Sequence, residues 1–127
     1  METKKAAVWF EMYVNDIQRA TKFYETVLDT KLEPLGDPSD QNLVMMSFPG
    51  DMSSYGSGGA LVQMEGVKAG GNSTIIYFNS KDCTTEESRV VAAGGQVFKP
   101  KMDIGQYGFI SICLDSEGNM FGLHSME

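Results

Sequence analysis

This sequence has few of the residue patterns that would assign a function directly. It contains one histidine and two cysteines among 127 residues. Asp and Glu outnumber Lys and Arg by 17 to 10, so the chain lacks the basic surface with which proteins replace the counterions of nucleic acids. No apolar run approaches membrane-spanning length, and the first residues contain no apolar segment typical of a secretory signal. We therefore expect no nucleic-acid partner, no membrane partner and, by default, a cytoplasmic location.

The cysteines also lack a recognisable spacing. Cys83 and Cys113 are far apart and belong to no CxxC or Cys/His pattern. Two reduced thiols packed in the interior are expected, with a disulfide as the alternative. Hydrophobic residues make up 42% of the chain and charged residues 21%, which is ordinary for a folded protein. The length is that of one compact domain with its own core.

The first half of the chain reads as strand, helix and three strands. Residues 7–14 alternate between an apolar side and a mixed side that contains Trp9, Glu11 and Tyr13, which predicts a half-buried strand. Asn15-Asp16 then supplies a helix cap, and apolar residues recur at helical spacing from Ile17. Three short strands are predicted at 31–35, 43–48 and 60–65.

The same order then repeats. A strand is predicted at 74–79 and a helix at 82–93, with Thr84 and Glu87 as a capping box and Gly94-Gly95 as the stop. Strands follow at 96–99, 109–114 and 120–125, the last two joined by a turn-rich loop at 115–119. This duplication predicts one domain, 1–127, with a first module at about 6–66 and a second at about 72–127.

Each predicted module leaves one sheet face without a helix, and the two bare faces are expected to enclose a trough. Trp9, Glu11 and Tyr13 would face this trough, together with three further groups. These groups are Leu61/Gln63/Glu65, Ile75/Tyr77/Asn79 and Gly122/His124. Val62 and Met64 would then face the helix of the first module.

Two segments resemble a known family. VWFEMYVNDIQRATKFYETVL is similar to the opening strand and helix of the vicinal-oxygen-chelate superfamily, which includes glyoxalases, bleomycin resistance proteins and dioxygenases. RVVAAGGQVFKPKMDI and YGFISICLDSEGNMFGLH resemble its closing half. The resemblance implies an α+β fold of two tandem βαβββ modules that form an incomplete curved barrel around a cleft. It also implies a homodimer.

In the catalytic members of this superfamily a divalent metal is held by His, Glu or Gln residues from the first and last strands of each module. Carried onto this chain, the four positions fall near Trp9, Gln63, Ile75 and Gly122. Only Gln63 could coordinate a metal, so we expect no metal and no cofactor. A shifted set of Glu11, Glu65, Tyr77 and His124 is disfavoured, because antiparallel pairing of a module's first and last strands would separate Glu11 from Glu65 by roughly 13 Å.

Three functions follow from these expectations. The first is metal-independent binding of a small organic molecule against the aromatic rings of Trp9, Tyr13 and Tyr77, with Glu11, Gln63 and His124 as polar contacts. The second is a glyoxalase-like lyase or dioxygenase-type enzyme that uses a divalent metal or Glu11 and His124 in acid–base catalysis. The third is a structural or regulatory domain whose trough is filled by its own side chains. The loop at 49–59 is either a flap over the cleft or an ordinary exposed loop.

Overall fold

The computed structural model describes residues 7–37, 39–51, 53, 55–71 and 74–127. The first module contains β1 (Trp9–Tyr13), α1 (Ile17–Leu28), β2 (Glu33–Leu35), β3 (Leu43–Ser47) and β4 (Gly58–Met64). The second contains β5 (Ile76–Asn79), α2 (Cys83–Glu87), β6 (Gln96–Asp103), a 3₁₀ turn at Gly105–Tyr107, β7 (Phe109–Leu114) and β8 (Met120–Ser125). The predicted pair of βαβββ modules is confirmed.

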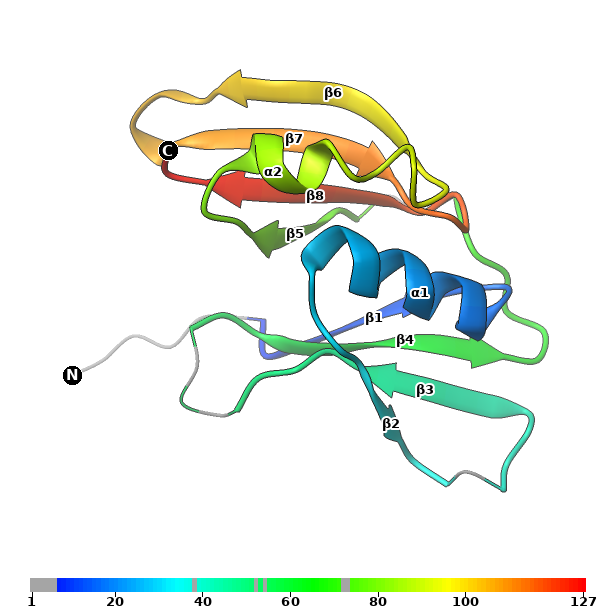
Figure 1. Ribbon diagram of the computed structural model, residues 1–127. Coiled ribbons are helices and arrows are strands. Elements are labelled where there is room, and N and C mark those ends of the chain that lie inside the picture. Colours follow the sequence, from blue (N-terminus) through cyan, green and yellow to red (C-terminus); the bar gives the residue numbers. More distant parts are fainter. Residues whose placement is uncertain (1–6, 38, 52, 54, 72–73) are drawn as a thin grey trace.

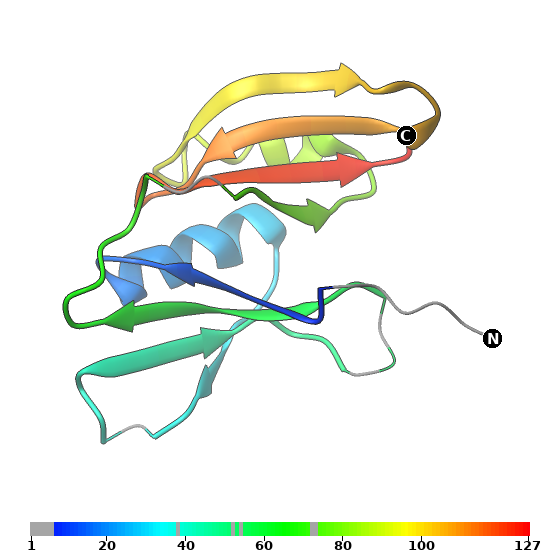
Figure 2. The same ribbon diagram turned by 180° about the vertical axis from the view of Figure 1, so that it is seen from behind.

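Each module forms a four-stranded mixed sheet, in the order β1-β4-β3-β2 and β5-β8-β7-β6. The two helices lie on one side of the sheets, in front of the strands in Figure 1 and behind them in Figure 2. We call the strand side without helices the open face. The sheets are not closed into a barrel. Instead, β1 and β5, the edge strands of the two sheets, face each other.

The first and last strands of each module run parallel, which corrects the antiparallel pairing expected from the sequence. Met12 of β1 lies beside Leu61 of β4, and Phe78 of β5 lies beside Leu123 of β8. Glu11 is therefore paired with Ala60, and Glu65 is five residues farther along β4 and its extension, or about 16 Å at the usual strand rise. The shifted metal set is still excluded, but by a different geometry.

One hydrophobic core joins the two modules on the helix side. Phe23 and Tyr24 of α1 contact the ring of Phe121 from β8, with ring centroids 5.9 and 5.4 Å apart. Phe10 and Phe48 of the first module contact Phe78 of the second, at 5.8 and 5.3 Å. Cys83 and Cys113 are buried free thiols, as expected, and burial raises the pKa of Cys113 to about 11.

The second helix is shorter than predicted. It ends at Glu87, and its N-cap is Asp82, whose side chain accepts a hydrogen bond from the Thr84 amide. Glu87 instead accepts bonds from the Lys101 amide and the Ser111 hydroxyl, so the predicted capping box is wrong. After Glu87 several backbone amides donate hydrogen bonds to the carbonyl three residues earlier, as in a turn. The segment ends at Gly94, which has a φ of +107°. No helix of the described residues is long and apolar enough to span a membrane.

Candidate functional site

The two modules meet along the free edges of β1 and β5. The Val14 amide donates to the Val62 carbonyl of β4, so the backbone groups of Val14 face β4. Backbone groups alternate in direction along a strand, so those of Trp9 and Glu11 point away from β4 and toward β5. Likewise the Ser80 amide donates to His124, which directs the backbone groups of Tyr77 toward β1. In the part of the chain that the structure describes, β1 and β5 have one partner strand each.

Three adjoining cavities follow this junction, and Ile76 lines all of them. We call them together the seam cleft. The central cavity measures about 460 Å³, the cavity at the Tyr13 end about 190 Å³, and the cavity at the His124 end about 520 Å³. The trough is therefore not filled by the described side chains, and it follows the junction between two sheets.

The central cavity brings together three of the residues predicted from the sequence. Trp9 and Glu11 of β1 line one side, and Tyr77 of β5 lines the other. The Glu11 carboxylate is held by its neighbours on the same strand face. It accepts hydrogen bonds from the Trp9 indole at 3.2 Å and from the Tyr13 hydroxyl at 3.0 Å. The aromatic neighbours thus orient the carboxylate without neutralising it.

Both aromatic rings of the central cavity lie against a glycine on the neighbouring strand. Trp9 is paired with Gly58 and Tyr77 with Gly122. A Cβ atom at Gly122 would lie 2.3 Å from the Tyr77 ring, and one at Gly58 would lie 3.2 Å from the indole. The two glycines therefore make room for the rings, which remain 44% and 45% exposed.

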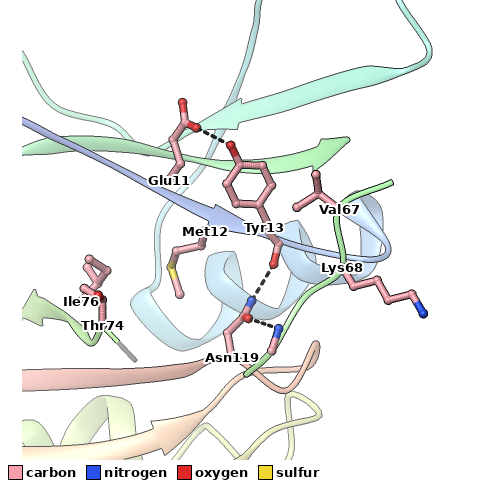
Figure 3. Close-up of a pocket in the computed structure, with 9 residues that line it drawn as sticks. Glu11, Met12, Tyr13, Val67, Lys68, Thr74, Ile76 and Asn119 are labelled. Carbon is pink, nitrogen blue, oxygen red and sulfur yellow. Dashed lines mark hydrogen bonds between the residues drawn. The ribbon is translucent and has the colours of Figure 1, made fainter. Parts of the chain in front are cut away.

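At one end of the seam cleft, Tyr13 lies between Glu11 and the loop before β8 (Figure 3). The Asn119 side chain donates to the Tyr13 carbonyl at 2.9 Å and accepts from the Gly70 amide at 2.7 Å. The hydrogen bond to Glu11 raises the pKa of the Tyr13 hydroxyl. Lys68 also lines this cavity, but its ammonium group points away from Glu11 (Figure 3).

His124 lies at the opposite end, in the cavity lined also by Tyr77, Asn79 and Glu86. Its Nε2 is 2.7 Å from the Tyr107 carbonyl oxygen. Because a carbonyl can only accept, Nε2 carries a hydrogen and is the donor in this contact. Glu86 accepts a hydrogen bond from the Ser80 hydroxyl.

Gln63 does not belong to the cleft, contrary to the prediction. Its Oε1 accepts a 2.7 Å hydrogen bond from the Ile17 amide, at the first turn of α1. Leu61 is on the same strand side and packs in the core, whereas Val62 is on the open face beside Tyr13. The predicted faces of β4 are thus reversed.

The residues at the family's metal positions do not form a metal site here. Trp9, Ile75 and Gly122 carry no metal-binding group, and Gln63 is turned toward α1. Among the described residues, no group of three or more His, Cys, Asp or Glu side chains is arranged to hold a metal ion. The four-ligand set of the catalytic members does not fit this chain.

The sequence did not point to several residues that line the seam cleft. Phe10 and Ile76 reach the cleft although their strand neighbours Glu11 and Tyr77 lie on the other face, because a cavity at an edge strand touches both of its faces. Asn119 lies in the turn-rich loop, where its residue type alone suggested a turn. Its two long-range hydrogen bonds depend on how the modules dock.

Comparison with known proteins gives a family and a fold. The family model of the Glyoxalase/Bleomycin resistance protein/Dioxygenase superfamily matches residues 6–123. No curated protein sequence is significantly similar. A hypothetical protein from S. aureus superposes with a TM-score of 0.66 at 17% identity, with 94% of this chain and 96% of that chain covered.

Two further structures show the same fold. A glyoxalase/bleomycin resistance protein/dioxygenase family enzyme from Burkholderia phytofirmans has a TM-score of 0.69 at 14% identity, over 94% of this chain and 97% of that chain. Glyoxalase I from Zea mays has a TM-score of 0.73 at 19% identity, over 93% of this chain but 43% of that chain. At these identities the likeness concerns the fold alone.

Proposed function

The chain belongs to the glyoxalase/bleomycin resistance protein/dioxygenase superfamily, and from that premise we propose that it binds a small organic molecule in the seam cleft without a metal ion. The observation that carries the proposal is the central cavity. Its volume of about 460 Å³ lies within the range of small-molecule sites, and exposed aromatic rings from both modules flank it. A flat or apolar ligand would lie between Trp9 and Tyr77, where it would cover ring surface that is otherwise in contact with water.

Trp9 is the only tryptophan of the chain, so its fluorescence reports directly on this cavity. A panel of aromatic and peptide-like compounds should contain members that change the emission saturably and raise the melting temperature. Tyr77→Leu should weaken the binding of such a compound by about tenfold or more, because the substitution removes the aromatic ring on one side of the cavity. Phe98→Leu is the control, since Phe98 is exposed on β6 outside the seam cleft. Equal affinities for the two variants, or no binder in the panel, would contradict the proposal.

The alternative function is metal-free acid–base catalysis. The observation in its favour is that His124 lines one end of the seam cleft. The His124 side chain and the Glu11 carboxylate belong to different cavities of the same cleft, and imidazole and carboxylate groups are the usual general acids and bases. Incubating each binding compound with the protein and following it by mass spectrometry tests this alternative. Turnover lost in His124→Gln with Trp9 quenching retained would support it. Homodimer formation stays a prediction from the family resemblance, to be decided by light scattering.

A further inference from the structure

We propose that the central cavity of the seam cleft selects organic cations, with Glu11 as the counter-charge and the rings of Trp9 and Tyr77 as its walls. This inference rests on the proposed function and adds the ligand's charge to it. It depends on the hydrogen-bond partners of Glu11, on the rings around it and on the backbone groups of the two strand edges.

The first argument is the charge of Glu11. Its two hydrogen-bond donors, the Trp9 indole and the Tyr13 hydroxyl, are both neutral. The salt bridges among the described residues join Arg19 to Glu117 and Lys101 to Asp82, so Glu11 takes part in none of them. An ionised carboxylate offers about four acceptor sites, and two donors leave some of them for a ligand. A negative charge is thus held in a defined direction in the cavity, and among the described residues no cationic side chain is paired to it.

The second argument is the aromatic rings on both sides of this charge. The indole of Trp9 uses its N–H edge to bind Glu11, which leaves its ring face for a ligand. Tyr77 lines the same cavity from the other module. Aromatic faces attract ammonium and guanidinium groups, most strongly for tryptophan, at distances up to about 6 Å from the ring centre. Anions and strongly hydrated groups would gain nothing from these rings.

The third argument is the polarity of the strand edges. The backbone groups of Trp9 and Glu11 are directed toward the cleft rather than toward β4, and those of Tyr77 are directed toward it from β5. The Asn119 amide already donates to the next carbonyl along this edge, that of Tyr13. Each of these residues presents an N–H and a C=O together, so the edges offer carbonyl acceptors to a ligand without adding net charge. The negative potential comes from Glu11 and from the net charge of −7 for the chain. Of the described residues that line the adjoining cavity, Lys68 alone is cationic, and its ammonium group points away from Glu11 (Figure 3).

A matched pair of probes separates charge from shape. Choline and 3,3-dimethyl-1-butanol have nearly the same size and branching, but only choline is charged. With a single tryptophan, the indole N–H of Trp9 gives one resonance in a ¹⁵N-labelled protein, and either probe can be titrated against it at low ionic strength, where screening is weak. We expect choline to shift this resonance saturably and to bind at least tenfold more tightly than the alcohol.

Two variants localise the effect. Glu11→Gln keeps the side-chain shape and removes the charge, so the preference for choline should fall below about twofold. Glu33→Gln removes the same charge from an exposed position on the distal strand β2 and should keep the preference. Equal binding of the two probes to the native protein, absence of choline binding, or an undiminished preference in Glu11→Gln would overturn the inference. If neutral or anionic compounds still bind at Trp9, the proposed function stands without it, and if no compound binds there, both fail.

Discussion

Single residues decide how the aromatic rings of the cleft are placed. Tyr77 can lie across β8 only because position 122 is a glycine, and a Cβ there would be 2.3 Å from the ring. The equivalent position of the first module, Gly58, is less tight, since a Cβ would be 3.2 Å from the Trp9 ring. Neither glycine has a positive φ, so an alanine would fit the backbone and would act on the rings alone.

Gly122→Ala should therefore displace Tyr77, and Gly58→Ala should change Trp9 much less. We expect Gly122→Ala to cost about 1–3 kcal/mol of stability through overpacking, and to weaken any ligand of the central cavity. Urea denaturation measures the loss of stability, and a ligand titration followed by Trp9 fluorescence measures the loss of affinity. Gly58→Ala serves as the graded control. Equal effects of the two substitutions would show that the rings do not depend on these contacts.

At the scale of the elements, α1 is held at its N-terminus by side chains from three places. Asp16 caps the helix itself, Gln63 of β4 accepts from the Ile17 amide, and Glu117 of the β7–β8 loop accepts from the Asn15 and Asp16 amides. Arg19 donates to Glu117 at 2.5 and 2.8 Å, and the Glu117 side chain is fully buried. Helix N-termini leave backbone donors without partners, so these acceptors stabilise the helix and join it to the second module.

Glu117→Gln should therefore lower the stability by about 2–4 kcal/mol at pH 7, because it removes a buried, charged acceptor. Burial raises the pKa of Glu117, but the bonds from Arg19 and Asp16 outweigh it, and the folded pKa is lowered. A lowered folded pKa gives stability that is present above the unfolded value and lost as the pH falls through the folded one. The difference in unfolding free energy between the native protein and Glu117→Gln should therefore become smaller below about pH 4.

Urea titrations at pH 7 and at pH 3.5 measure this gap. Glu33→Gln is the control, since it removes an exposed carboxylate and should leave the stability nearly unchanged at both pH values. A gap for Glu117→Gln that is constant over this range would contradict the assigned role of its charge.

The elements also show which parts of the fold can be predicted from the sequence. Residues 7–14 alternate cleanly, so the two faces of β1 were predicted correctly from Trp9 to Tyr13. In β4, the run from Gly58 to Val62 is apolar throughout or lacks side chains, so no alternation indicates which residues face the helix. Pairing with β1 decides it, by placing Leu61 beside Met12. Gln63 was misplaced for this reason.

The candidate site depends on information that no local pattern contains. Trp9, Glu11 and Tyr77 were predicted to share a hollow, and the structure brings them together in one cavity. The position of that cavity at two strand edges follows from how the modules dock, and so does the part played by Ile76. Periodicity reports which face of a strand is buried, but it does not report what lies beside its edge.

At the scale of the whole molecule, the two modules share their interior. Phe10, Tyr24 and Phe48 of the first module contact Phe78 and Phe121 of the second. The buried Tyr24 hydroxyl donates to Asp115 at 2.7 Å, and desolvation raises the pKa of that carboxyl. Neither module could bury these groups alone. The chain should therefore unfold as one cooperative unit despite its internal duplication.

The distribution of two residue types allows a direct test of this cooperativity. The only tryptophan, Trp9, is in the first module, and both cysteines are in the second, where they are buried and unreactive while the protein is folded. The urea dependence of Trp9 fluorescence and that of thiol labelling in a short pulse should coincide. Tyr24→Phe removes the hydroxyl donor of Asp115 and should lower the free energy of unfolding by about 1–3 kcal/mol, so that both urea midpoints fall together. Midpoints that separate, or a Tyr24→Phe effect confined to the tryptophan signal, would show that the modules fold independently and that the seam cleft opens without global unfolding.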